Sequence, residues 1–192
     1  MVGIVNVDYF RLALKMDTVL TINAYTAPGL AVGVASGRLS FMFGLTGPAG
    51  SVDTACSSSL VALHMGLSTV ERTESDDALS CGVNLALTPM CTMLFNQSGM
   101  MAQDGRCKTM DATADGYVRG EGVVVIHLRG QMNKKENNIV GAHLLSSVIN
   151  QDGPSSSLTA PSGPSQIAAL STGTCIFTIH RDTRIHLPWK CA

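Results

Sequence analysis

Apolar and polar residues are spaced in two ways along this chain, first as in helices and then as in strands. Between residues 60 and 70 the apolar side chains leave few polar interruptions, which predicts a helix buried on most of its sides. The acidic segment 71–77 follows at once and predicts that this helix ends at the surface. A shorter helical pattern, YFRLALK, covers residues 9–15.

The spacing changes at three places to one that is typical of β-strands. ALSCGVNLAL (78–87) predicts a short buried strand. VVVIHLR (123–129) and NNIVGAHLLSSVI (137–149) predict two more, because both are rich in β-branched residues. Strands that alternate with helices along a chain indicate an α/β layer fold.

Small residues dominate the segment from Ala24 to Phe43, and they suit close packing of a helix on its neighbours. The cluster GLTGPAGS (44–51) comes next, and its proline and three glycines predict a turn. The helical pattern of residues 60–70 therefore follows soon after a glycine-rich turn.

Composition indicates that much of the surface of this chain is normally covered. Hydrophobic residues make up 45% of the 192 residues and charged residues only 14%, whereas a soluble domain has about 25% charged residues. The length fits one domain. Because clear periodicity is lost after GPSQ, we expect one partial domain over residues 1–167 and a divergent tail over residues 168–192.

Charge and hydropathy exclude several classes of partner. A net charge of −1 with scattered Lys and Arg offers no patch for nucleic acid or for an anionic membrane. No apolar run reaches the roughly 20 residues of a membrane span and no signal-peptide pattern opens the chain, so we expect a cytoplasmic location. In that compartment the cysteines are expected to be free thiols, without the spacing of a zinc site. They are Cys56, Cys81, Cys91, Cys107, Cys175 and Cys191.

Cys56 is the residue with the strongest claim to chemistry. It lies in DTACSSSLVALH (53–64), at the first turn of the predicted buried helix. There the unpaired N–H groups and the helix dipole favour a thiolate over a thiol, and the same N–H groups can bind the oxyanion formed when a thioester is attacked. Free cysteines are also commonly buried as small apolar side chains. Spacing alone leaves both interpretations open.

The sequence identifies no base for Cys56. His64 lies eight residues further along the same helix, a rise of about 12 Å, which is too far for a hydrogen bond. No G-x-S-x-G, phosphate-loop or dinucleotide motif occurs, so the serines at 57–59 are interpreted as helix-start residues and no nucleotide cofactor is expected. The other histidines lie in strand patterns or in the tail: His127, His143, His180 and His186.

Charged residues gather in DGRCKTMDATADGYVRGEG (104–122), in a chain otherwise poor in charge. One interpretation is a solvated loop, and the other is a charge network that fixes loops near a site. Periodicity does not separate the two. The residues are Asp104, Arg106, Lys108, Asp111, Asp115, Arg119 and Glu121.

These residues together resemble a known family. The segment around Cys56 resembles the active-site segment of the β-ketoacyl synthase domains of polyketide and fatty acid synthases. Three further segments agree with that family in the same order, so the resemblance covers about residues 2–167. The four are NAYTAPGLAVGVASGRLSFMFGL, GPAGSVDTACSSSLVALH, MMAQDGRCKTMDATADGYVRGEGVVV and INQDGPSSSLTAPSGPSQ.

The resemblance implies a thiolase-like fold of α-β-α-β-α layers, of which this chain holds mainly the N-terminal half and the start of the C-terminal half. It implies that Cys56 accepts an acyl chain from the phosphopantetheine arm of an acyl carrier protein, with its backbone N–H in the oxyanion hole. A malonyl-type thioester then loses CO₂ and attacks the acyl group. No cofactor is bound directly, and a homodimer is expected.

The resemblance stops before two histidine motifs of the family, E-A-H-G-T-G-T and K-S-N-I-G-H, which do not occur in this sequence. We therefore expect acyl transfer to Cys56 without a complete condensation. The alternative hypothesis is a non-catalytic fragment or interaction remnant of such a synthase. If the thiol is activated, iodoacetamide is expected to alkylate Cys56 ahead of the other five cysteines.

Overall fold

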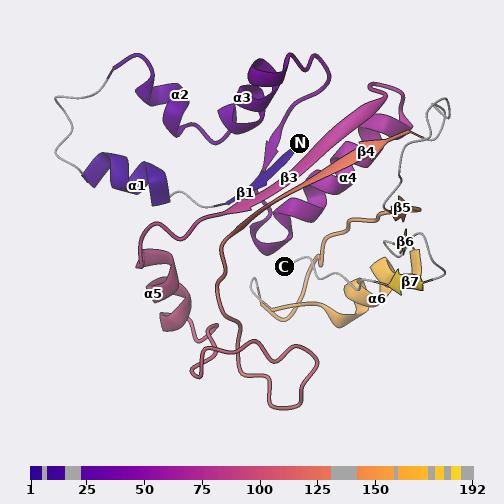
Figure 1. The fold of residues 1–192 in the computed structure, drawn as a ribbon. Coiled ribbons are helices and arrows are strands. Elements are labelled where there is room, and N and C mark those ends of the chain that lie inside the picture. Colours follow the sequence, from indigo (N-terminus) through magenta and orange to yellow (C-terminus); the bar gives the residue numbers. More distant parts are fainter. Residues whose placement is uncertain are drawn as a thin grey trace.

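The computed structural model describes residues 1–5, 8–15, 23–130, 142–157, 160–172, 176–179 and 183–186. Figure 1 shows the order of the elements. The helices are α1 (Asp8–Lys15), α2 (Thr26–Leu30), α3 (Val34–Phe43), α4 (Ser58–Glu71), α5 (Met90–Gln97) and α6 (Gly163–Thr172), with a short 3₁₀ turn, η2 (Ala55–Ser57). The strands are β1 (Val2–Ile4), β2 (Ser51–Val52), β3 (Asp77–Asn84), β4 (Gly122–Arg129), β5 (Ala142–Leu144), β6 (Ile176–Ile179) and β7 (Thr183–His186).

The main sheet has the strand order β2-β1-β3-β4. β1 runs parallel to both β2 and β3, and β4 closes the sheet antiparallel to β3. A smaller antiparallel sheet contains β5, β6 and β7. Helices joined to a mostly parallel sheet confirm the predicted α/β class.

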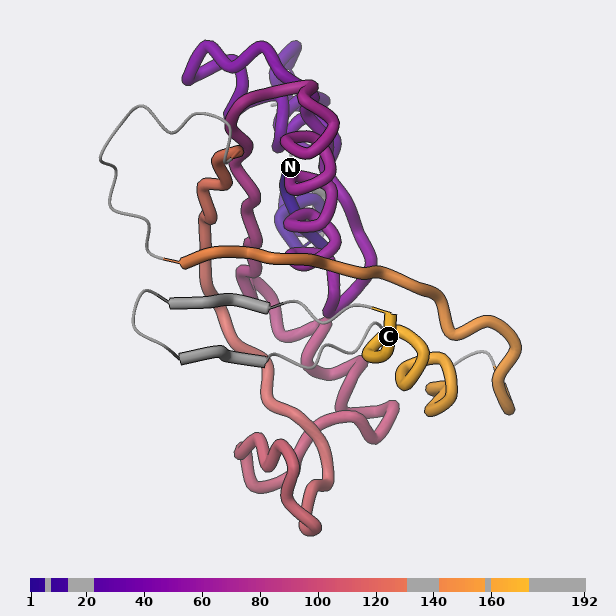
Figure 2. The backbone as a smooth tube through the Cα atoms, turned by 90° about the vertical axis from the view of Figure 1, so that its right-hand side faces the viewer, coloured from indigo at the N-terminus to yellow at the C-terminus, as the bar shows by residue number. Residues whose placement is uncertain are grey.

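α4 covers one face of the main sheet, and Figure 2 shows it running beside the strands. Its buried side chains include Val61, Ala62 and Leu63. The Ser80 hydroxyl, 3% exposed, donates to the carbonyl of Ala62 at 2.9 Å and ties the helix to β3. The prediction of a buried helix over residues 60–70 is confirmed, and the acidic residues after it are exposed as expected.

The strand predictions differ in how well they hold. β3 lies within the predicted segment apart from its first residue, with Ser80 and Cys81 buried at its centre. β4 has nearly the predicted range, but its first valines are open to solvent, with Val123 65% exposed. The third strand is shorter than predicted, because only Ala142–Leu144 pairs as a strand, while residues 137–141 lie outside the described residues.

Close packing of the small-residue segment is not observed. In α3 only Ser36 is buried, and Phe41 is 87% exposed at the C-terminal end of the helix. The turn at 44–51 is present, and Gly44 ends α3 with a positive φ of 64°. Phe41 and the exposed valines of β4 contribute to a large exposed apolar surface, as the low charge content suggests. Within the described ranges no helix is long and apolar enough to cross a membrane.

Candidate active site

Cys56 lies in the η2 turn that leads from β2 into α4, and its side chain is exposed. The turn connects the sheet to the N-terminal end of a 14-residue helix, where the first N–H groups have no partner within the helix. Cys56 is therefore not a buried small side chain. It stands at the positive end of α4 with its sulfur accessible.

Ala55, the residue before Cys56, has a positive φ of 53°. A residue with a Cβ occupies this left-handed region at a cost of about 1–2 kcal/mol. Such conformations persist only where the surroundings hold them, and they gather at functional sites. The backbone that presents Cys56 is thus held in a conformation that alanine does not favour.

Polar groups surround this backbone segment. The Asp53 carboxylate accepts the N–H of Ala55 at 3.0 Å. The Ser58 hydroxyl accepts the N–H of Thr54 at 2.8 Å and donates to the carbonyl of Ala55 at 2.7 Å. The Ser57 hydroxyl lies 2.8 Å from the carbonyl oxygen of Thr54. Ser57 and Ser58 are buried, so the interpretation of these serines as helix-start residues is consistent with their contacts.

Two glycines let the first turn of α4 rest directly on the sheet. Gly3 and Gly82 are register partners on β1 and β3. A Cβ at Gly3 would lie 2.5 Å from backbone atoms of Ser58 and Ser59, and a Cβ at Gly82 would lie 2.6 Å from the Cβ of Ser59. Real Cβ atoms do not approach this closely, so both positions require glycine. Sequence reasoning missed this pair, although an isolated glycine in a strand pattern is a signal of close backbone approach.

His64 is engaged away from Cys56. Its Nδ1 lies 2.8 Å from the hydroxyl oxygen of Ser147, in the segment that follows β5. It therefore joins α4 to a distant part of the chain. This agrees with the helix rise, which places His64 too far from Cys56 for a hydrogen bond. His143 lies on β5 as predicted, His186 ends β7, and His180 lies outside the described residues.

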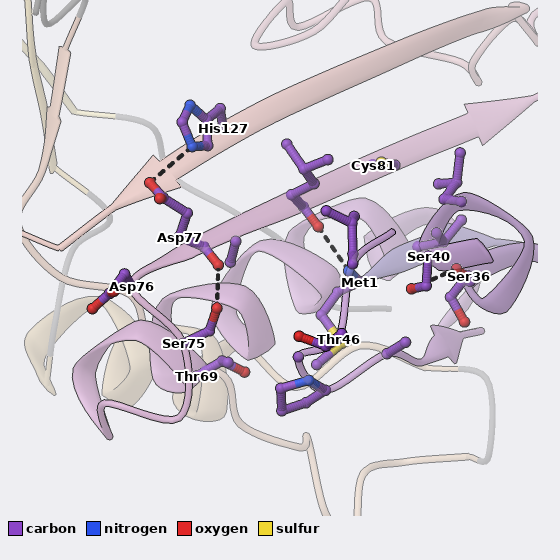
Figure 3. A pocket seen from close by; sticks show the side chains of 18 of the residues that line it. Met1, Ser36, Ser40, Thr46, Thr69, Ser75, Asp76, Asp77, Cys81 and His127 are labelled. Atoms are coloured by element: carbon purple, nitrogen blue, oxygen red, sulfur yellow. Dashed lines mark hydrogen bonds and ion pairs between the residues drawn. The ribbon is translucent and has the colours of Figure 1, made fainter. Parts of the chain in front are cut away.

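His127, on β4, belongs to an exposed ionic cluster at the edge of the main sheet. Its Nε2 lies 3.0 Å from Oδ1 of Asp77, and Nε of Arg129 donates to the same oxygen at 2.8 Å. The hydrogen bond from Arg129, followed by that from His127, holds the pKa of Asp77 below its usual range. Figure 3 shows Asp77 between His127 and Ser75.

This cluster borders a cavity of about 460 Å³ between β1, β3, α3 and the turn at 44–49. Ser80 and Gly82 face α4, whereas Leu79 and Cys81 line the cavity, because alternate residues of a strand face opposite ways. None of residues 53–58 lines it. The cavity is therefore separate from the Cys56 turn.

Replacing Asp77 by asparagine is expected to change the free energy of unfolding by less than about 1 kcal/mol, because all three members of the cluster are solvated. The pKa of Asp77 is lowered in the folded state, so its contribution is present above about pH 4 and is lost as the pH falls further. Urea unfolding of both proteins at pH 7 and at pH 3 measures this. The difference in the free energy of unfolding between the two proteins should be smaller at pH 3 than at pH 7.

The charged segment 104–122 is an exposed loop with ionic contacts of its own, and its place near a site stays a prediction. Lys108 bridges Asp104 at 3.1 Å and Asp115 at 2.6 Å, and these contacts raise its pKa although the loop is exposed. Glu121 accepts the N–H of Ala86 at 2.7 Å just after β3. Arg119 lies 5.2 Å from the ring centroid of Phe95 on α5, a cation–π contact. The network thus fixes this loop to α5 and to the end of β3.

The four cysteines within the described residues are free thiols. Cys81 is buried in β3, and Cys91 lies 3.4 Å from Oδ1 of Asp8. Burial and then the hydrogen bond to Asp8 raise the pKa of Cys91. Cys107 is exposed like Cys56, and its sulfur accepts the N–H of Val118 at 3.1 Å. Cys175 and Cys191 lie outside the described residues.

Because Cys107 is exposed as well, the order predicted from sequence changes: iodoacetamide at neutral pH is expected to alkylate both Cys56 and Cys107, rather than Cys56 alone, before Cys81 and Cys91. The reaction needs an accessible thiolate. Cys81 is buried, and the raised pKa of Cys91 keeps its thiol protonated at neutral pH. Peptide mass spectrometry after short exposures gives the order. Early labelling of Cys81 would mean that the cavity face of β3, where Cys81 lies, is open to the reagent in solution.

Comparison with known proteins identifies the family. Residues 1–133 match the family model described as Beta-ketoacyl synthase, N-terminal domain. The chain is 42% identical over 171 residues to a phenolphthiocerol/phthiocerol polyketide synthase of Mycobacterium tuberculosis, with 88% of this chain and 8% of that protein covered. It is 44% identical over 166 residues to erythronolide synthase EryA3 of Saccharopolyspora erythraea, with 85% of this chain and 5% of that protein covered.

Solved structures agree with the family and the fold. The ketosynthase from module 6 of the bacillaene synthase of Bacillus subtilis superposes with a TM-score of 0.77 at 34% identity, over 89% of this chain and 28% of that one. The oxazolomycin ketosynthase domain OzmH KS7 of Streptomyces albus gives 0.81 at 26% identity, over 89% and 30%. The expected thiolase-like fold is confirmed, although the chain spans less than a tenth of the length of these two curated relatives. The chain belongs to the β-ketoacyl synthase family and carries the N-terminal ketosynthase domain found in modular polyketide synthases.

Proposed function

We propose that this chain performs the acyl-accepting step of a polyketide ketosynthase, with Cys56 as the nucleophile. The observation that carries the proposal is the exposed Cys56 sulfur at the N-terminal end of α4, on a turn held by Ser57, Ser58 and Asp53. A carrier-bound thioester can reach an exposed thiol, and the unpaired N–H groups at a helix N-terminus can bind the oxyanion that its attack forms. The substrate is an acyl thioester on the phosphopantetheine arm of an acyl carrier protein.

In this step the Cys56 thiolate attacks the thioester carbonyl carbon and forms a C–S bond. The carbonyl oxygen gains the negative charge, and the backbone N–H of Cys56 is proposed to stabilise it together with the positive end of α4. The intermediate collapses, the bond to the carrier sulfur breaks, and the carrier thiolate takes a proton from solvent. The product is acyl-Cys56, the covalent intermediate that divides the overall reaction into two easier steps.

Condensation with a malonyl-type extender is proposed for the whole synthase rather than for this chain. The side chains of His64 and His127 are engaged with Ser147 and Asp77, so neither is available to assist decarboxylation at Cys56. We propose that the domain acts as a homodimer in the cytoplasm, with carrier protein as its partner. Residues 1–167 are proposed to form the ketosynthase part and residues 168–192 a divergent tail, although α6 (Gly163–Thr172) runs through that boundary.

The test is incubation of the chain with an acyl carrier protein that bears a short acyl group, followed by intact-protein mass spectrometry. The expected result is a mass increase of one acyl group per chain, with release of the free carrier thiol. A malonyl carrier protein added afterwards is expected to give no β-ketoacyl product. A folded chain that binds carrier protein and gains no mass would support the alternative, a non-catalytic interaction module whose apolar faces at Phe41 and Val123 meet other parts of a synthase.

A further inference from the structure

Three side chains hold the strained turn before Cys56, and one of them, Ser58, contacts both of its ends. Thr54 has φ −131° and ψ 41°, and Ala55 has φ 53°, so two successive residues lie outside the conformations that they prefer. Contacts with the surrounding residues must therefore stabilise these two conformations.

The Ser58 hydroxyl contacts both ends of this two-residue segment. It accepts the N–H of Thr54 at 2.8 Å and donates to the carbonyl of Ala55 at 2.7 Å. The backbone N–H of Ser58 also binds that carbonyl. The two contacts fix the peptide groups on either side of the strained dihedrals, and Ser58 is 3% exposed, so water does not compete for them.

The neighbouring groups act differently. The Ser57 hydroxyl contacts the carbonyl and the hydroxyl of Thr54, and Asp53 accepts the N–H of Ala55. Both side chains therefore hold the peptide group between Thr54 and Ala55, whereas Ser58 holds the two outer peptide groups. Ser58 itself is fixed because the first turn of α4 rests on Gly3 without an intervening side chain. The sheet therefore fixes Ser58, and Ser58 in turn fixes the residue that precedes the sulfur.

We infer that Ser58 is a positioning residue for Cys56: its buried hydroxyl holds Ala55 in the left-handed conformation that sets the direction of the Cys56 side chain. The inference rests on the proposed function only where acyl transfer is the readout. The conformation of Ala55 can be measured whether or not Cys56 is acylated.

The experiment compares Ser58→Ala with Ser59→Ala, which removes the neighbouring exposed hydroxyl from the same turn and serves as the matched control. The first readout is the ¹³C chemical shifts of Ala55, which report its backbone conformation. The second is the rate at which an acyl carrier protein acylates Cys56. In Ser58→Ala we expect the shifts to leave the left-handed range and the rate to fall about tenfold, while Ser59→Ala stays within about twofold of the original chain.

A second variant separates positioning from general loss of structure. Glycine adopts a positive φ without the cost that alanine bears, so Ala55→Gly should restore most of the acylation rate when it is combined with Ser58→Ala. A loss that Ala55→Gly does not reduce would overturn the inference, as would unchanged Ala55 shifts in Ser58→Ala. If the original chain is never acylated, the proposed function fails, and the Ala55 shifts alone decide whether Ser58 positions the turn.

Discussion

Replacement of Cys56 by alanine is expected to abolish acyl transfer to this chain and to leave its fold intact. The side chain is exposed, so its truncation leaves no cavity, and the free energy of unfolding should change by less than about 0.5 kcal/mol. The two adjacent hydroxyls cannot take over, because Ser57 and Ser58 are buried and use their hydroxyls on Thr54 and Ala55. Removal of a covalent nucleophile should reduce the rate by at least about 10³-fold.

The measurement is the rate of mass gain with an acyl carrier protein, and thermal unfolding of the same sample checks the fold. Cys107→Ala is the matched control, because Cys107 is the other exposed thiol among the described residues and lies in the loop at 104–122. It should be acylated at the rate of the original chain. Acylation of Cys56→Ala at an undiminished rate would remove Cys56 from the mechanism.

The second large effect is expected at the two glycines beneath α4. Gly3→Ala should lower the free energy of unfolding by about 3 kcal/mol, because the new Cβ meets backbone atoms of Ser58 and Ser59 at 2.5 Å. A backbone atom cannot rotate away as a side chain can, so the whole first turn of α4 must shift. Gly82→Ala meets the Cβ of Ser59 at 2.6 Å and should cost slightly less.

Urea unfolding measures both effects, and Gly122→Ala is the control. Gly122 lies in the same sheet on β4, and a Cβ there meets nothing within 4 Å. It should be neutral or slightly stabilising. Acylation of Cys56 should fall in both β1 and β3 variants, since their clash displaces the turn that carries the sulfur. Unchanged stability in Gly3→Ala would show that α4 does not rest on β1 as described.

The sequence pattern predicted the elements that have few polar interruptions. α4 and β3 were found from sequence because both are largely apolar segments, and both hold buried residues in the structure. The sequence pattern predicted the exposure of β4 and α3 poorly, because a run such as VVV has the same composition whether it is buried or exposed. Small residues in α3 likewise indicate that a neighbour can approach closely, without indicating that one does.

The site was predicted in part, from the position of Cys56 at a helix start. Its supporting contacts depend on tertiary structure. Ala55 has no propensity for a positive φ, and the contacts of Ser57, Ser58 and Asp53 hold it in that conformation. The hydrogen bond between His64 and Ser147 joins residues 83 positions apart, a separation that spacing along one helix cannot anticipate.

The most direct test of the central claim is to locate the acyl group on the chain. After incubation with an acyl carrier protein, the protein is digested and the peptides are sequenced by tandem mass spectrometry. The account predicts the acyl group on Cys56 alone, with the likewise exposed Cys107 unmodified. An acyl group spread over both thiols in proportion to their exposure, or found only on Cys107, would contradict the account.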